Sequence, residues 1–505
     1  ISVEGSFTVG DAATLTMTHG TLFMDGAGNQ NLDLDAQVIP NLTLNKTTTA
    51  TDNVVVLANG KVNLSGTLTI TQGNLDLATN SETLSASGAV TLAASSQATL
   101  ATDSDMGVEG NFTLGDGASL TVTHGTLTLD GSGNQNLDLY GSYLNNLTIN
   151  KTTTATDNVV VLADGKVNLS GALTITQGNL DLATNSETLS ASGAVTLAAS
   201  SQATLATDSD MGVEGNFTLG DGASLTVTHG TLTLDGSGNQ NLDLYGSYLN
   251  NLTINKTTTA TDNVVVLADG KVNLSGALTI TQGNLDLVTN TETLSASGAV
   301  TLADNAQSTL ATDSDMAVLG NFTVGDAATL TMAHGTLTLR GSGNQNLDLD
   351  AQVIPNITLN KTTTATDNVV VLANGKVNLS GTLTITQGNL DLATNSETLS
   401  ASGAVTLAAS SQATLATDSD MGVEGNFTLG DGASLTVTHG TLTLDGSGNQ
   451  NLDLYGSYLN NLTINKTTTA TDNVVVLADG KVNLSGALTI TQGNLDLATN
   501  SETLS

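Results

Sequence analysis

The sequence lacks the residues on which several common kinds of protein site depend. It contains no cysteine, no tryptophan and only two prolines, and aromatic residues make up 2% of its 505 positions. The absence of cysteine excludes disulfide bonds, thiolate metal sites and cysteine nucleophiles. With so few aromatic residues, a pocket for an organic cofactor is not expected, and we predict no cofactor.

Positive charge is also scarce. The chain has 11 basic residues against 47 acidic ones, so its net charge is −36 at pH 7. Such a charge repels nucleic acid and anionic membranes, and neither is an expected partner. No run approaches the ~20 apolar residues of a membrane span, so no transmembrane segment is predicted. Hydrophobic residues still make up 39% of the chain, which is enough to form a core.

Internal repetition organises the whole chain. Closely similar segments begin every 105 residues, at Met106, Met211, Met316 and Met421. We therefore divide the chain into five units that follow one another without linkers: 1–105, 106–210, 211–315, 316–420 and the shorter 421–505. Residues 421–505 are identical to 106–190, so three units form a higher repeat of 315 residues. The start at Ile1 and the end within a repeat indicate a piece of a longer protein.

Within a unit, apolar residues alternate with threonine. On either side of His124-Gly125, Leu and Val at 120, 122, 127 and 129 alternate with Thr, which is typical of strands with one apolar face. Such short strands cannot bury that face alone, but coils stacked ~4.8 Å apart can. The pattern predicts an all-β fold, a right-handed parallel β-solenoid with four or five coils of roughly 21 to 26 residues per unit. We expect one continuous solenoid; separate β-sandwich domains are the alternative.

Three longer motifs recur in the same order in the units. They are GSGNQNL at 131–137, LNNLTINKT at 144–152 and VNLSGALTITQGNLDL at 167–182. This succession resembles the giant β-strand-repeat surface proteins of bacteria, which are similar in kind to filamentous-haemagglutinin-like adhesins. The resemblance spans the chain. It implies an extracellular stalk or fibre at the cell surface and no catalytic residues.

Paired aspartates near the unit boundaries are the strongest metal candidates. Ca²⁺ takes six to eight oxygen ligands, of which an Asp-x-Asp pair supplies a part, yet the sequence contains neither an EF-hand loop nor the glycine-rich nonapeptide of β-rolls. We treat the pairs as weak calcium candidates, with a solvated acidic corner as the favoured alternative. They are Asp103, Asp105, Asp208, Asp210, Asp313, Asp315, Asp418 and Asp420.

Catalytic groups are not suggested by the remaining polar residues. One histidine per unit precedes glycine in a turn (His19, His124, His229, His334 and His439). Copies 105 residues apart cannot converge on one zinc ion or complete one triad, so we predict solvated turn residues. Carboxylates such as Asp181 and Glu187 recur in every unit, which is unusual for an enzyme site. We therefore expect no enzymatic activity.

Two further features are candidates for contact or modification. Three units carry a Tyr-Gly-Ser-Tyr segment, which we interpret as a contact loop or, alternatively, as a lid over the core: Tyr140, Tyr143, Tyr245, Tyr248, Tyr455 and Tyr458. Four N-x-[ST] sequons in the second unit are candidate glycosylation sites, with asparagine ladders as the alternative: Asn111, Asn146, Asn150 and Asn168. Arg340, the one arginine, replaces an aspartate found in the other units.

These observations favour a structural role. We predict a rigid extracellular stalk or fibre segment of an adhesin-like surface protein, whose reach is set by repeat number. The alternative is a carbohydrate-binding or polysaccharide-degrading β-helix. The expected partners are further copies of the chain, through fibres or lateral bundles, with host or environmental glycans as a second class.

Overall fold

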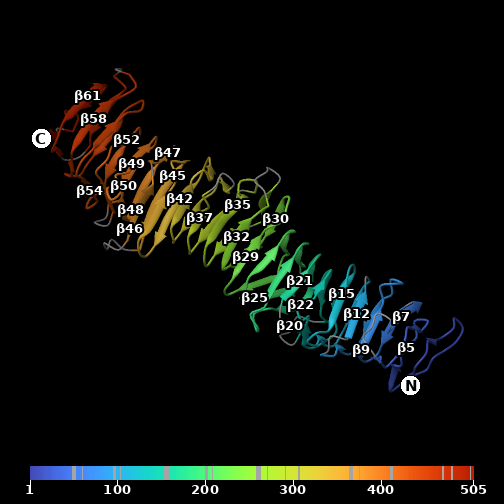
Figure 1. The fold of residues 1–505 in the computed structure, drawn as a ribbon. Helices are drawn as coiled ribbons and strands as arrows, with labels where there is room; N and C mark the ends of the chain where they lie inside the picture. The colour runs from blue at the N-terminus through green and yellow to red at the C-terminus, as the bar shows by residue number, and fades with distance from the viewer. Residues whose placement is uncertain are drawn as a thin grey trace. The chain divides into compact units, whose positions relative to one another are not determined.

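The computed structural model describes the chain outside a set of short segments, namely 48–52, 60, 95–97, 103, 153–157, 165, 200–202, 208, 258–262, 270, 291, 305–307, 363–367, 375, 410–412, 469–470, 479–480 and 501. The described residues fall into two bodies. The N-terminal body comprises 1–236 and 240–250, and the C-terminal body comprises 237–239 and 251–505. Each body is a stack of short parallel strands (Figure 1), which confirms the predicted β-solenoid.

The alternation of apolar residues and threonine gives strands of two to nine residues, and the described residues contain no helix. The second unit shows the order of strands, which runs β13 (Met106–Val108), β14 (Phe112–Leu114), β15 (Ser119–Val122), β16 (Thr126–Leu129), β17 (Gln135–Asp138), β18 (Tyr143–Leu144), β19 (Asn146–Asn150), β20 (Val159–Asp164), β21 (Lys166–Leu169), β22 (Leu173–Asp181), β23 (Thr188–Ala191), β24 (Val195–Leu197) and β25 (Ala203–Thr207).

Most strands pair in parallel with the strand three positions further along the chain, so three strands make one coil. Where β22 lies on two faces, β20, β21 and β22 pair with the strand two positions further. Along one face of the N-terminal body, β10 (Leu84–Ala86) is followed by β13, β16, β19, β22 and β24. Along this face Leu127 pairs with Leu147, 20 residues on, and Leu147 pairs with Leu173, 26 residues on. Coil length therefore varies slightly more than the sequence predicted.

The core consists of ladders of identical or similar apolar side chains. In β19, Leu147 and Ile149 are 0% exposed, and the strand alternates buried and half-buried positions. Leu127 and Leu173, which pair with Leu147 from the coils on either side, are also fully buried. Each such leucine contributes about 1.5–3 kcal/mol of hydrophobic stabilisation. The predicted interior ladders are thus confirmed.

Glycines allow the chain to turn where coils touch. A Cβ atom on Gly110 would lie 2.5 Å from the backbone carbonyl carbon of Gly88 on the preceding coil, so this corner accepts no side chain. At a second corner, β22 bends at Gly178, whose φ is 100°. Residues 173–175 of β22 pair with β24 and residues 178–181 pair with β25, so this one strand lies on two faces.

The 105-residue unit does not contain a whole number of coils. From β10 to β22, the described part of the chain contributes 13 strands, and because β22 lies on two faces it fills 14 positions. Three positions make a coil, so 14 positions make four and two-thirds coils. Leu84 pairs with Met106 on the first face. The repeat equivalent of Leu84 is Leu189, which makes the equivalent pairing with Met211 but lies on another face, in line with Val167. Equivalent residues of successive units are displaced by one face.

Candidate functional site

The second aspartate of each predicted calcium pair has a structural partner. Asp105 accepts a hydrogen bond of 2.9 Å from the backbone amide of Thr126, which begins a strand of the next coil. The three copies of Asp105 accept the same 2.9 Å bond from the threonine 21 residues further on. They are Asp210, Asp315 and Asp420. These carboxylates therefore tie one coil to the next.

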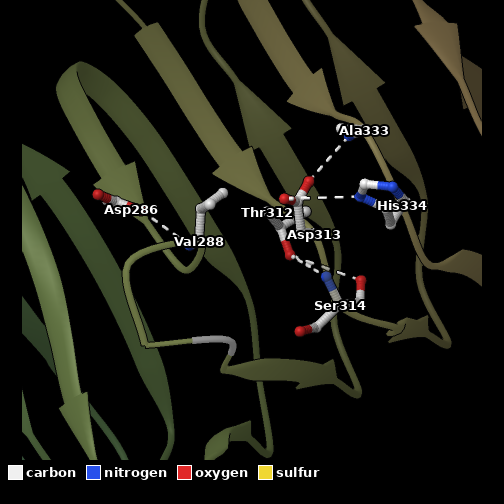
Figure 2. A network of polar contacts seen from close by, with 7 residues as sticks. All are labelled: Asp286, Val288, Thr312, Asp313, Ser314, Ala333 and His334. Carbon is white, nitrogen blue, oxygen red and sulfur yellow. Dashed lines mark hydrogen bonds and ion pairs between the residues drawn. The ribbon is translucent and has the colours of Figure 1, made fainter.

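The first aspartate of each pair is less regular. Asp103 and Asp208 lie outside the described residues. Asp313 accepts a 3.0 Å hydrogen bond from the Ala333 amide, and its other oxygen lies 3.8 Å from Nδ1 of His334, as Figure 2 shows. Asp418 lies 3.5 Å from the hydroxyl of Ser419. In the part of the chain that the structure describes, no group of three or more His, Asp or Glu side chains could hold a metal ion.

The histidines lie in exposed turns, as the sequence predicts. His124 follows β15 and precedes β16, and its copies are exposed in the same way. The side chain of His334 is 82% exposed. The five histidines are thus solvated, and the described neighbours place none of them in a catalytic constellation.

The recurring aspartate that ends the long strand caps a turn. Asp181 accepts hydrogen bonds from the amides of Ala183 (2.8 Å) and Thr184 (3.0 Å), and the hydroxyl of Thr184 donates to its second oxygen at 2.5 Å. In the third unit, Asp286 binds the Val288 amide in the same way (Figure 2). In the fifth unit, the hydrogen bond from Thr499 is the main cause of a lowered pKa of Asp496. Such a carboxylate serves as an acceptor for its own turn.

Two of the four sequon asparagines connect coils. The side-chain oxygen of Asn111 accepts a 2.9 Å bond from the amide of Asn136. Asn146 accepts from the Ala172 amide at 2.8 Å and donates to the Gly125 carbonyl at 3.2 Å. Asn168 is half-buried within β21, and Asn150 is exposed at the end of β19. The structure thus gives Asn111 and Asn146 the role of ladder residues, and glycosylation stays a prediction.

The tyrosine loops project into solvent. Tyr140 is 45% and Tyr143 66% exposed, and the copies in the third and fifth units have nearly the same values. The interpretations of this segment as a contact loop and as a lid over the core both stay predictions. Residues 139–142 form a tight turn in which the Ser142 amide donates to the Leu139 carbonyl at 2.8 Å. Because φ is 46° at Tyr140 and 75° at Gly141, the turn is of type I′.

A buried lysine in each repeat was not singled out from the sequence. Lys151 is 1% exposed, and its Nζ donates to the side-chain oxygen of Gln135 and to the carbonyl of Asp130, both at 2.5 Å. The Gln135 amide nitrogen in turn donates to the carbonyls of Val108 and Gly110 at 2.9 and 2.6 Å. The network joins three successive coils inside the solenoid.

The same network recurs at Lys46, Lys361 and Lys466, each of which donates to the glutamine 16 residues before it. Burial lowers the pKa of these lysines and of Lys151, and beside Lys151 the carboxylates of Asp130 and Glu109 act in the opposite direction.

The fourth unit changes the surroundings of its lysine. Leu319 and Arg340 stand where the second unit has Glu109 and Asp130. Burial alone accounts for the lowered pKa of Lys361, with no opposing carboxylate. The guanidinium group of Arg340 donates to the hydroxyl of Ser295 at 3.1 Å, which gives this arginine a partner within its own solenoid.

No helix in the described residues is long and apolar enough to cross a membrane. Comparison with known proteins gives no match to any family, to any curated protein or to any solved structure. The chemistry of the residues is therefore the basis for any functional conclusion.

Proposed function

We propose that this chain is a structural spacer, a segment of an extracellular stalk or fibre that belongs to an adhesin-like cell-surface protein. The main support is the way in which the repeated polar residues are used. Recurring polar residues such as Asp105, Asn146, Lys151 and Asp181 bond to neighbouring coils or to their own turns. A sequence under selection for stiffness has this property, because each such bond resists bending between coils.

The repeat architecture supports the same proposal. Each coil contacts only its neighbours, so coils can be added or removed in whole sets without rebuilding a core. An array of this kind can change its length by duplication, and the identity of 421–505 with 106–190 is consistent with recent duplication. In this proposal repeat number sets the distance that the stalk spans.

A catalytic role is not part of the proposal. An enzyme site depends on groups that are free to meet a substrate, whereas the recurring Asp181 and Asp286 are occupied as turn caps. The carbohydrate-degrading alternative lacks a specific supporting observation. Carbohydrate binding is favoured by one feature, the exposed tyrosine loops.

Immunogold labelling of intact, unpermeabilised cells tests whether the protein lies outside the cell and whether it forms filaments. The antibody should be raised against the repeat, and a matched sample of permeabilised cells serves as the control. We expect gold particles along thin filaments outside the cell. Label that is seen only after permeabilisation, or only in the medium without filaments, would exclude a surface stalk.

A further inference from the structure

The six tyrosines of the chain all lie in the three Tyr-Gly-Ser-Tyr loops. The backbone conformation of the loop does not favour tyrosine at its first position. The first tyrosine of each loop has a φ between 45° and 47°, a left-handed conformation that costs free energy for any residue with a Cβ atom. In the first and fourth units the same turn position is occupied by Asp35 and Asp350, a residue type that tolerates this conformation better.

Burial does not account for the tyrosines either. Tyr140 is 45% exposed and Tyr143 66% exposed, so a large part of the surface of both residues is open to solvent. A strained and exposed aromatic residue that recurs three times is a feature that points to contact with another molecule. In the first and fourth units the position of the second tyrosine is also apolar and exposed, because Val38 and Val353 stand there and are 53% and 56% exposed.

We propose that each tyrosine pair is a contact site for a neutral polysaccharide. The net charge of −36 opposes binding of an anionic polymer and close approach of a second copy of the chain. The negative face of an aromatic ring attracts the polarised C–H groups of a sugar. Around the rings the surface is polar: Asn168 pairs with Tyr143 from the next coil, and Asn145 and Ser170 form a hydrogen bond of 3.1 Å beside them. Amide and hydroxyl groups are suitable partners for sugar hydroxyls.

Because a unit does not contain a whole number of coils, the loops lie on different faces. In the N-terminal body, Tyr143 lies in β18, which pairs with β21 and continues through β23 to β26 (Met211–Val213). Tyr248 lies in β31 (Tyr248–Leu249), which contacts β28 (Ser224–Val227) in the line of strands that contains β20 and β25. A flexible polymer that surrounds the solenoid can reach both loops at once, and simultaneous contacts raise the apparent affinity.

This proposal goes beyond the spacer role and does not depend on it, because a chain in any location could bind a glycan. Binding is tested with the whole purified chain by electrophoresis through gels that contain a neutral β-glucan, a neutral mannan or the anionic polymer alginate. Since the chain has no tryptophan, its tyrosine fluorescence reports on these loops alone. We expect at least one neutral polymer to retard the chain and to change this fluorescence, and alginate to do neither.

The matched variant comes from the chain itself. Replacing residues 140–143, 245–248 and 455–458 by Asp-Ala-Gln-Val, which stands at 35–38, removes all tyrosines. The turn is kept, because φ is 46° at Asp35 and 57° at Ala36. Because the turn is kept, we expect unchanged far-UV circular dichroism, and we expect an apparent affinity for the neutral polymer that falls about tenfold or more. Replacing one loop alone should remove one of the three sites.

Three results would overturn the proposal. The native chain fails to bind either neutral polymer, the tyrosine-free variant binds as the native chain does, or the native chain self-associates in sedimentation whereas the variant stays monomeric. The last result would assign the loops to a second copy of the chain. None of the three bears on surface labelling, so failure of this proposal is distinguishable from failure of the spacer role.

Discussion

Replacing Gly178 by alanine should destabilise one defined coil. Gly178 has a φ of 100°, and a Cβ atom there would lie 2.4 Å from Cγ and 2.7 Å from Cβ of the buried Lys151. The left-handed conformation costs an alanine about 1–2 kcal/mol, and overpacking against a buried side chain costs about 1–3 kcal/mol. The expected loss in the local free energy of unfolding is therefore about 2–5 kcal/mol.

Two other glycines of the same unit separate these contributions. Gly133 has a φ of 83° and no atom within 4 Å of the added Cβ, so Gly133→Ala should show the conformational cost alone, about 1–2 kcal/mol. Gly107 lacks a positive φ, and its nearest neighbour would be an oxygen of Asp130 at 4.0 Å. Gly107→Ala should be close to neutral, and the fourth unit has Ala317 at this position.

Hydrogen–deuterium exchange with mass spectrometry provides the local measurement. A peptide that carries the substitution differs in mass from the otherwise identical peptides of other units, so mutated and native coils can be compared within one molecule. Exchange reports the free energy of local opening. If Gly178→Ala opens no more readily than Gly133→Ala, the close packing of Lys151 against this corner is wrong.

Three further predictions concern the polar networks. Burial lowers the pKa of Lys361, so between that pKa and about 10.4 the unfolded chain binds more protons than the folded chain, and the free energy of unfolding should rise with pH across this window. Lys361→Met should reduce this rise, measured by urea unfolding at several pH values. An unchanged pH dependence would contradict the burial of Lys361. Asp315→Ala removes the acceptor of the Thr336 amide and should lower the free energy of unfolding by about 1 kcal/mol. Asp315→Asn keeps an acceptor and should lower it less. Equal losses of stability in thermal melts would refute the role of this hydrogen bond. Asn146→Ala breaks two bonds between coils and should cost about 1–3 kcal/mol in local exchange, while Asn150→Ala, on an exposed side chain, should leave exchange unchanged.

Much of the fold follows from the period-two pattern. Alternating apolar residues around His124 predict short strands with one buried face, and the structure has them in parallel stacks. The exposed turn histidines were also predicted correctly. The number of coils per unit could not be fixed, because it depends on turns whose lengths vary; coil length ranges from the 20 residues between Leu127 and Leu147 to the 26 between Leu147 and Leu173.

The buried lysine could have been found from the sequence. Leu147 and Ile149 point inward, and the same alternation assigns Lys151 to the interior; Gln135 shares its phase with the buried Leu137. We did not predict burial from this pattern, because lysine is rarely buried in proteins. By contrast, the role of Asp105 could not be read locally, because its partner Thr126 is 21 residues away and meets it only when the coils stack. Without knowledge of that distant partner, the closeness of Asp105 to Asp103 in the sequence suggested a metal ligand.

The length gained for each added repeat tests the spacer account most directly. Three units hold 14 coils, so inserting one further 315-residue block should lengthen the particle by about 67 Å at ~4.8 Å per coil. Electron microscopy of chains that differ by one such block measures this increment. A uniform gain near this value would support a spacer whose reach follows repeat number. A smaller gain, or lengths that scatter widely as in a flexible string of domains, would contradict it.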